Sequence, residues 1–118
     1  MAHELPKTIP TVLISAAHIL QDRGWCRGTL IDNSGALCLL SAIFVASTGK
    51  VATCFYSEDE HDELTKSAWS VVEDLINVRY GGSGQGTLTI PGWNDMSTRT
   101  IEDIFVILDD AAAISTFA

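Results

Sequence analysis

The residues best suited to chemistry gather near the end of the chain, in a short segment that begins at Trp93. Asn94 and Asp95 follow the tryptophan directly, and Arg99 lies four residues beyond Asp95. Asn and Asp side chains readily accept hydrogen bonds from the free N–H groups at a helix start, and Arg99 is within reach of Asp95 once the turn closes. We therefore predict that this segment organises the start of the last helix and holds it against the connector at 25–28.

A polar pocket is the alternative use of these residues, shared with Trp25 and Arg27 of the connector. Cys38 is the candidate nucleophile, because it follows a turn near a predicted helix start, where a thiol pKa can fall. A nucleophile also needs a base, and the sequence places no histidine beside Cys38. A free cysteine in an apolar run usually packs in a core, so we assign no catalytic residue. The structural or functional cluster comprises Trp25, Arg27, Cys38, Trp93, Asn94, Asp95 and Arg99.

Cofactor and metal signatures are not found in the sequence. The glycine-rich loop at 81–86 has no lysine after it, so it does not match a phosphate-binding loop. Cys26, Cys38 and Cys54 stand 12 and 16 residues apart, without the close cysteine or histidine pair of a zinc site. An odd cysteine count also does not indicate a disulfide framework. We expect no cofactor, no structural metal and no disulfide.

Helical periodicity dominates the elements that must position these residues. Apolar residues recur at helical spacing over 9–23, and the segment 36–46 is apolar on every side, which is typical of a helix at the centre of a bundle. A third helix is predicted over 58–79, with Leu64, Ala68, Val71, Leu75 and Val78 on its buried face. A last helix is predicted to follow Asp95, with a cap pair at Thr100 and Asp103 and a buried face of Ile101, Ile104, Phe105, Leu108, Ala111 and Ala112.

These elements predict a mainly α protein with a compact four-helix fold. The candidate sheet is one short β pair, between 51–56 and 87–90. No repeat or linker divides the chain, so we expect a single domain over 1–118, with its core at about 8–115.

The composition narrows the classes of partner. Fifteen acidic residues outnumber seven basic ones, and the net charge of -8 repels a nucleic-acid backbone. The apolar run at 36–46 is far shorter than the ~20 residues that span a bilayer, and the N-terminus lacks the order of a signal peptide. We expect a cytoplasmic protein that binds neither nucleic acid nor a membrane. A mean hydropathy of +0.22 indicates more apolar surface than one small core needs, which favours a homodimer or another protein partner.

Several short motifs together resemble a family of uncharacterised small proteins from actinobacteria and their phages. They are Trp25-x-x-Gly28, Gly35-x-x-Cys38-Leu39-x-x-Ala42-Ile43, Trp93-Asn94-Asp95 and Arg99-Thr100. The resemblance covers residues 8–113, and Ser41 departs from it because the family more often has glycine there. It implies a compact domain in a bacterial or phage context, and it supplies no catalytic residue.

A non-enzymatic protein-binding domain is the function that these observations favour. The resemblance suggests a phage-encoded modulator of a bacterial host protein, in a bacterial or phage-infected cell. One alternative is a small enzyme or ligand-binding domain with a polar pocket around Cys38, Asp95 and Arg99. A structural or assembly subunit is the other.

Overall fold

Five helices form the regular structure of the described residues, which are 7–50, 63–81 and 87–116 of this computed structural model. They are α1 (Ile9–Arg23), α2 (Leu39–Thr48), α3 (Glu63–Tyr80), α4 (Ile90–Asn94) and α5 (Ile101–Thr116). The mainly α class is confirmed. The expected count of four helices is wrong because α4 is a separate short helix ahead of the last one.

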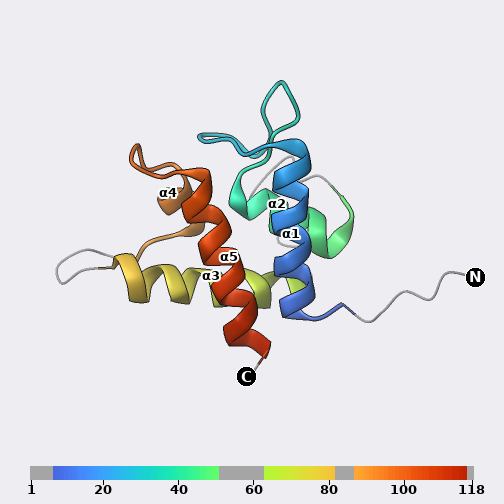
Figure 1. Cartoon of the computed structure of the whole chain (residues 1–118), viewed down its shortest axis with the longest axis vertical. Helices are drawn as coiled ribbons and strands as arrows, with labels where there is room; N and C mark the ends of the chain where they lie inside the picture. Colours follow the sequence, from blue (N-terminus) through green and yellow to red (C-terminus); the bar gives the residue numbers. More distant parts are fainter. Residues whose placement is uncertain (1–6, 51–62, 82–86, 117–118) are drawn as a thin grey trace, which may run out of the picture.

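The long helices α1 and α5 lie side by side and run in opposite directions (Figure 1). Helix α3 crosses behind them and contacts both, while α2 packs against α1 and α3. A single apolar cluster takes buried residues from all five helices, with Leu13, Ile43, Ile76, Trp93 and Leu108 among them. The short α4 contacts α2 and α3, so it closes one end of this core.

Helix α1 has the predicted bounds because its own sequence supplies both ends. Thr8 is the N-cap and exchanges hydrogen bonds with Thr11, and Pro10 occupies the first turn, where its missing N–H leaves no bond unmade. Gly24 ends the helix with a φ of 93°. His18 is exposed on this helix.

Helix α2 begins three residues later than predicted. Cys38 is its N-cap, and the Cys38 sulfur accepts a hydrogen bond from the Ser41 backbone N at 3.5 Å. Leu37 bonds to the connector instead, donating its backbone N–H to Gly24 O and accepting at its carbonyl from Cys26 N. The central burial of this segment is confirmed, since Ile43 has an exposed fraction of 0%.

Helix α3 was predicted over 58–79, and the residues before Glu63 lie outside the described part of the chain. Its buried face is rotated from the predicted one, because Val72 and Ile76 are buried while Val78 has an exposed fraction of 81%. Thr65 is also buried, and its hydroxyl shares a hydrogen bond with Ser47 of α2. The sequence therefore offers two overlapping apolar stripes on this helix, and the observed one also buries a polar contact with α2.

Residues 87–90, the described half of the predicted β pair, do not form a strand. Residues 51–56 lie outside the described part, but 87–89 have no regular structure and Ile90 is the first residue of α4. Thr89 caps α4 by accepting a hydrogen bond from Gly92 N at 3.1 Å. Pro91 stands in the first helical turn, where proline fits well. The Pro-Gly pair therefore begins a helix rather than a strand-ending turn.

Helix α5 begins after Thr100, so the expected role of Asn94 and Asp95 as its cap is wrong. Thr100 N donates to Asp103 Oδ2 at 3.1 Å, and Asp103 N donates to Thr100 Oγ1 at 3.3 Å. The predicted cap pair is thereby confirmed. The buried face of α5 includes Ile104, Leu108, Ala111 and Ala112 as predicted, together with Ile107. Among the described residues, no helix is long and apolar enough to cross a membrane.

Candidate functional site

The side-chain amide of Asn94, the last residue of α4, is fully buried and joins α4 to the connector between α1 and α2. Its Oδ1 accepts hydrogen bonds from Trp25 Nε1 at 2.7 Å and from Leu39 N at 3.0 Å. Its Nδ2 donates to Cys26 O at 3.1 Å and to Asp95 Oδ1 at 2.9 Å. Because an amide has two donors and two acceptor sites, this side chain is saturated within the protein.

Asp95 extends the same contact to the connector. Its Oδ1 also accepts a hydrogen bond from Gly28 N at 2.9 Å. Together with Thr29, Cys38 and Pro91, Gly28 and Asp95 line a hollow of about 70 Å³. That volume holds about two waters, against ~300 Å³ or more for a typical small-molecule site. The hollow joins Cys38 to Asp95, but it is too small for most organic substrates.

The buried guanidinium of Arg99 lies between two aromatic rings, 4.0 Å from the Trp93 ring centre and 4.6 Å from that of Tyr80. Its Nε donates to Trp93 O at 3.2 Å, and its Nη1 forms an ion pair with Asp103 at 3.3 Å. The expected pairing of Arg99 with Asp95 is therefore wrong. Arg99 instead pairs with Asp103, which lies four residues later in α5. Arg99 does not line the hollow beside Cys38.

Trp25 and Arg27 contact the same region from the connector. The Arg27 guanidinium lies 4.8 Å from the centre of the Trp25 ring, and its Nη2 donates to the Arg99 carbonyl. The Trp25 indole is bonded through Asn94, whereas buried Trp93 Nε1 has no hydrogen-bond partner among the described residues. We call Trp25, Arg27, Trp93, Asn94, Asp95 and Arg99 the Asn94 cluster.

The two described cysteines, Cys26 and Cys38, are buried free thiols. Burial raises the pKa of Cys38 and outweighs the backbone N–H groups of Ser41 and Leu40, which act in the other direction. Burial also raises the pKa of Cys26 to about 11, with a smaller contribution from Cys38. The structure therefore agrees with the expectation that Cys38 packs in the core, and it does not support the alternative of a thiol activated by the helix start. Both groups stay protonated at neutral pH, which makes them weak nucleophiles.

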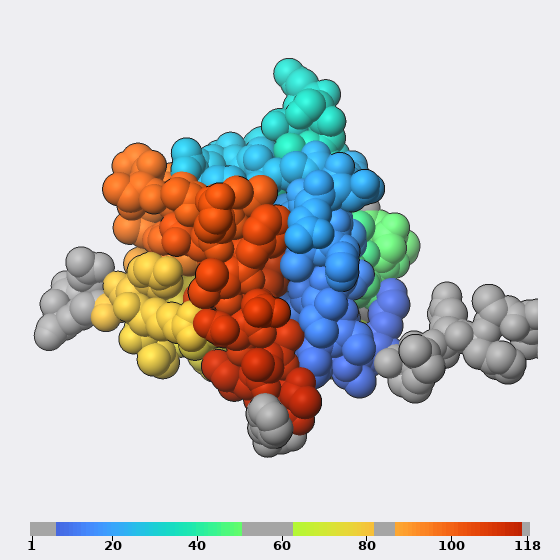
Figure 2. Space-filling model, in the orientation of Figure 1, coloured from blue at the N-terminus to red at the C-terminus, as the bar shows by residue number. Residues whose placement is uncertain are grey.

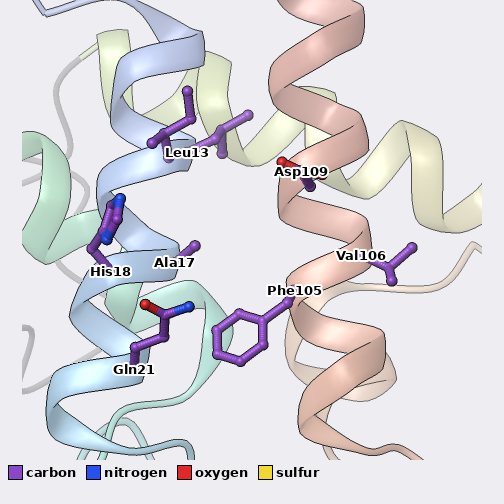
Figure 3. A pocket seen from close by; sticks show the side chains of 8 residues that line it. Leu13, Ala17, His18, Gln21, Phe105, Val106 and Asp109 are labelled. Atoms are coloured by element: carbon purple, nitrogen blue, oxygen red, sulfur yellow. The ribbon is translucent and has the colours of Figure 1, made fainter.

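A second feature lies on another face, where α1 and α5 adjoin (Figure 2). A groove of about 380 Å³ separates the outer faces of these helices, and we call it the α1–α5 groove. Figure 3 shows Phe105 reaching from α5 toward α1, close to Gln21. Two apolar lining residues are about half exposed, Ile14 at 49% and Val106 at 52%. The full lining is Leu13, Ile14, Ala17, His18, Gln21, Phe105, Val106 and Asp109.

A comparison with known families matches residues 4–114 to the model of a family described as of unknown function (DUF6197). The chain belongs to DUF6197. No curated protein and no solved structure matches it. For this DUF6197 protein, interpretation of function therefore rests on the arrangement of its own residues.

The α1–α5 groove was not predicted from the sequence. The sequence signal for it was a pair of apolar residues, Ile14 on α1 and Val106 on α5. Both lie outside the buried apolar faces of these amphipathic helices. Of the predicted cluster, the structure brings six residues into one connected region and places Cys38 at its margin. No group of three metal-binding side chains occurs within the described ranges.

Proposed function

We propose that this protein is a non-enzymatic protein-binding domain and that the α1–α5 groove is its binding surface. The observation that carries the proposal is a contrast between the Asn94 cluster and the α1–α5 groove in what their side chains contact. The side-chain amide of Asn94 is hydrogen-bonded within the protein. In the groove, by contrast, the apolar lining residues Ile14 and Val106 remain about half exposed. Exposed apolar residues that adjoin in this way are typical of interaction sites.

The finer form of the proposal is a phage-encoded modulator of a bacterial host protein, acting in the cytoplasm. Its support is the resemblance of the Trp25, Cys38 and Trp93 motifs to small actinobacterial and phage proteins, together with the short chain. The acidic net charge supports a protein partner over nucleic acid. A homodimer or an assembly subunit would use the same groove against a second copy.

A small enzyme or ligand-binding domain is the second candidate, favoured by the hollow that joins Cys38 to Asp95. Against it stand the size of the hollow, the raised pKa of the Cys38 thiol, and the position of Arg99 outside it. Alkylation with iodoacetamide at neutral pH, followed by peptide mass spectrometry, tests this candidate. We expect Cys38 to react in unfolded protein and to resist in native protein, whereas fast native alkylation would favour the enzyme.

The main test compares capture by three baits from bacterial lysate: the wild type, Ile14→Glu in the groove, and Val78→Glu. Val78 is the matched control, because it is an exposed apolar residue on α3 that does not line the groove. We expect proteins that the wild type and V78E retain but I14E loses, with binding of the purified partner then measured by calorimetry. Identical capture by all three baits, or capture by none, would contradict the proposal.

A further inference from the structure

We infer that the partner presents a basic amphipathic helix to the α1–α5 groove, with apolar anchors flanked by Lys or Arg. This inference rests on the proposed function and adds the chemistry of the partner. It depends on the charge of the groove, on its shape, and on the cost of placing a second copy there.

The first observation is that no Lys or Arg side chain lines the groove, whose lining includes the imidazole of His18. All seven Lys and Arg residues of the chain lie in the described ranges, and none of them lines the groove. Five are engaged elsewhere: Arg79 with Asp110, Arg99 with Asp103, Arg23 with Gly35 O, Arg27 with Arg99 O, and Lys7 with Ser47 O. A Lys or Arg side chain inside the groove would therefore come from the partner.

The second observation is that carboxylates stand in and beside the groove without partners. Asp109 lines it, and no ion pair joins Asp109 to another described residue. Exposed Glu102 precedes the lining residue Val106 by one helical turn, and exposed Asp22 follows Gln21. An apolar floor with acidic margins is complementary to an apolar stripe with basic margins.

The third observation is the spacing of the lining residues on α1. They run from Leu13 to Gln21 at helical intervals, which is about 12 Å along the helix axis. A docked helix that places apolar side chains at i, i+4 and i+7 covers about the same length. The groove between two antiparallel helices thus matches two turns of a third helix.

A second copy of the chain fits this surface less well. In a twofold dimer the same face meets itself, so Asp109 and the neighbouring Asp22 and Glu102 of both copies would share one interface that no Lys or Arg lines. Each copy also carries a net charge of -8. Like charges across an interface oppose association, whereas a basic helix removes that conflict.

The experiment uses the full chain and two synthetic helical peptides with identical leucine anchors, one flanked by lysines and the other by glutamates. Fluorescence anisotropy gives each Kd at low and high salt. We expect the lysine peptide to bind about tenfold more tightly, with the difference shrinking as salt screens the charges.

Asp109→Lys should reduce this ratio about fivefold, as expected for loss of an attractive pair and gain of a repulsive one. Asp74→Lys changes the net charge equally, but Asp74 is an exposed residue of α3 outside the groove, so this control should keep the ratio nearer the wild type.

Three results would overturn the inference. Equal affinity for both peptides would remove the basic preference while leaving groove docking intact. Binding of neither peptide, together with lysate capture that I14E abolishes, would exclude a helical ligand without touching the proposed function. Light scattering that shows a dimer, with I14E returning it to monomer, would assign the groove to a second copy.

Discussion

The Asn94 cluster and the α1–α5 groove use similar side chains in opposite ways. In the cluster, the buried amide of Asn94 makes four hydrogen bonds and the buried guanidinium of Arg99 lies between two rings, so these two polar groups are satisfied internally. In the groove, Asp109 has no ion-pair partner among the described residues, and Ile14 is half exposed. The polar segment that stands out in the sequence makes its contacts within the protein, whereas the inconspicuous helix surface leaves apolar side chains exposed.

Burial and hydrogen bonding of the polar groups distinguish a region that stabilises the fold from a surface that can bind a partner. A buried polar group is costly unless its bonds are made, so a saturated network stabilises one arrangement of the chain. An exposed polar group is hydrated, so it carries no such cost and is free to bind another molecule. Substitutions in the cluster should therefore change stability, while those in the groove should change binding.

The largest expected effect is that of Asn94→Ala. It leaves half-buried Trp25 Nε1 and buried Leu39 N and Cys26 O without their partner, and each unsatisfied buried group costs ~1–3 kcal/mol. We expect a loss of about 3–5 kcal/mol in the free energy of unfolding, measured by urea denaturation. Asn33→Ala, at an exposed turn position, is the control and should stay within ~0.5 kcal/mol. A small effect of N94A would show that the cluster is not scaffold.

Arg99→Lys should have the next largest effect. Lysine keeps the charge but loses the planar group between Trp93 and Tyr80, so we expect a loss of about 1–2 kcal/mol. Arg79→Lys is the control, because Arg79 forms a half-exposed surface ion pair with Asp110 that lysine can keep. Thermal unfolding of both variants gives the comparison, and equal melting temperatures would argue against the role of the rings.

Asp95→Ala should cost less, about 0.5–2 kcal/mol, because the bond from Gly28 N is exposed and water can replace the carboxylate. The measurement pairs urea denaturation with partner binding. Unchanged stability with lost binding would move Asp95 from the scaffold to the functional surface.

Acid should weaken the start of α5. The Thr100 backbone N–H, helped by Arg99, lowers the pKa of Asp103 below its usual 3.8. A carboxylate with a lower pKa in the folded state contributes stability above pH ~4, and this contribution is lost as pH falls through the folded pKa. We expect Asp103→Asn to make the acid decline in melting temperature shallower, as followed by circular dichroism. A decline as steep as that of the wild type would contradict this role of Asp103.

The smallest expected effect on stability is that of Ile14→Glu, because the side chain is half exposed. Its free energy of unfolding should stay within ~0.5 kcal/mol of the wild type, like that of Val78→Glu. Binding should then separate the two variants. A melting temperature lowered in I14E but not in V78E would mean that the groove is part of the core.

Prediction from sequence succeeded where an element carries its own signals. Pro10 and Gly24 mark the two ends of α1, and Thr100 with Asp103 fixes the start of α5. It failed where a distant partner decides. Leu37 is as apolar as a helix residue, but its hydrogen bonds to Gly24 and Cys26 keep it out of α2.

The sequence by itself determined the mainly α class, the bounds of α1 and the burial of the second helix. These follow from periodicity and capping, which act within a few residues. Only the tertiary structure decided what Asn94 binds, since its bonds to Trp25 and Leu39 cross 69 and 55 residues of chain. The α1–α5 groove is likewise tertiary, because α1 and α5 lie at opposite ends of the sequence and a surface between them exists only once they pack together.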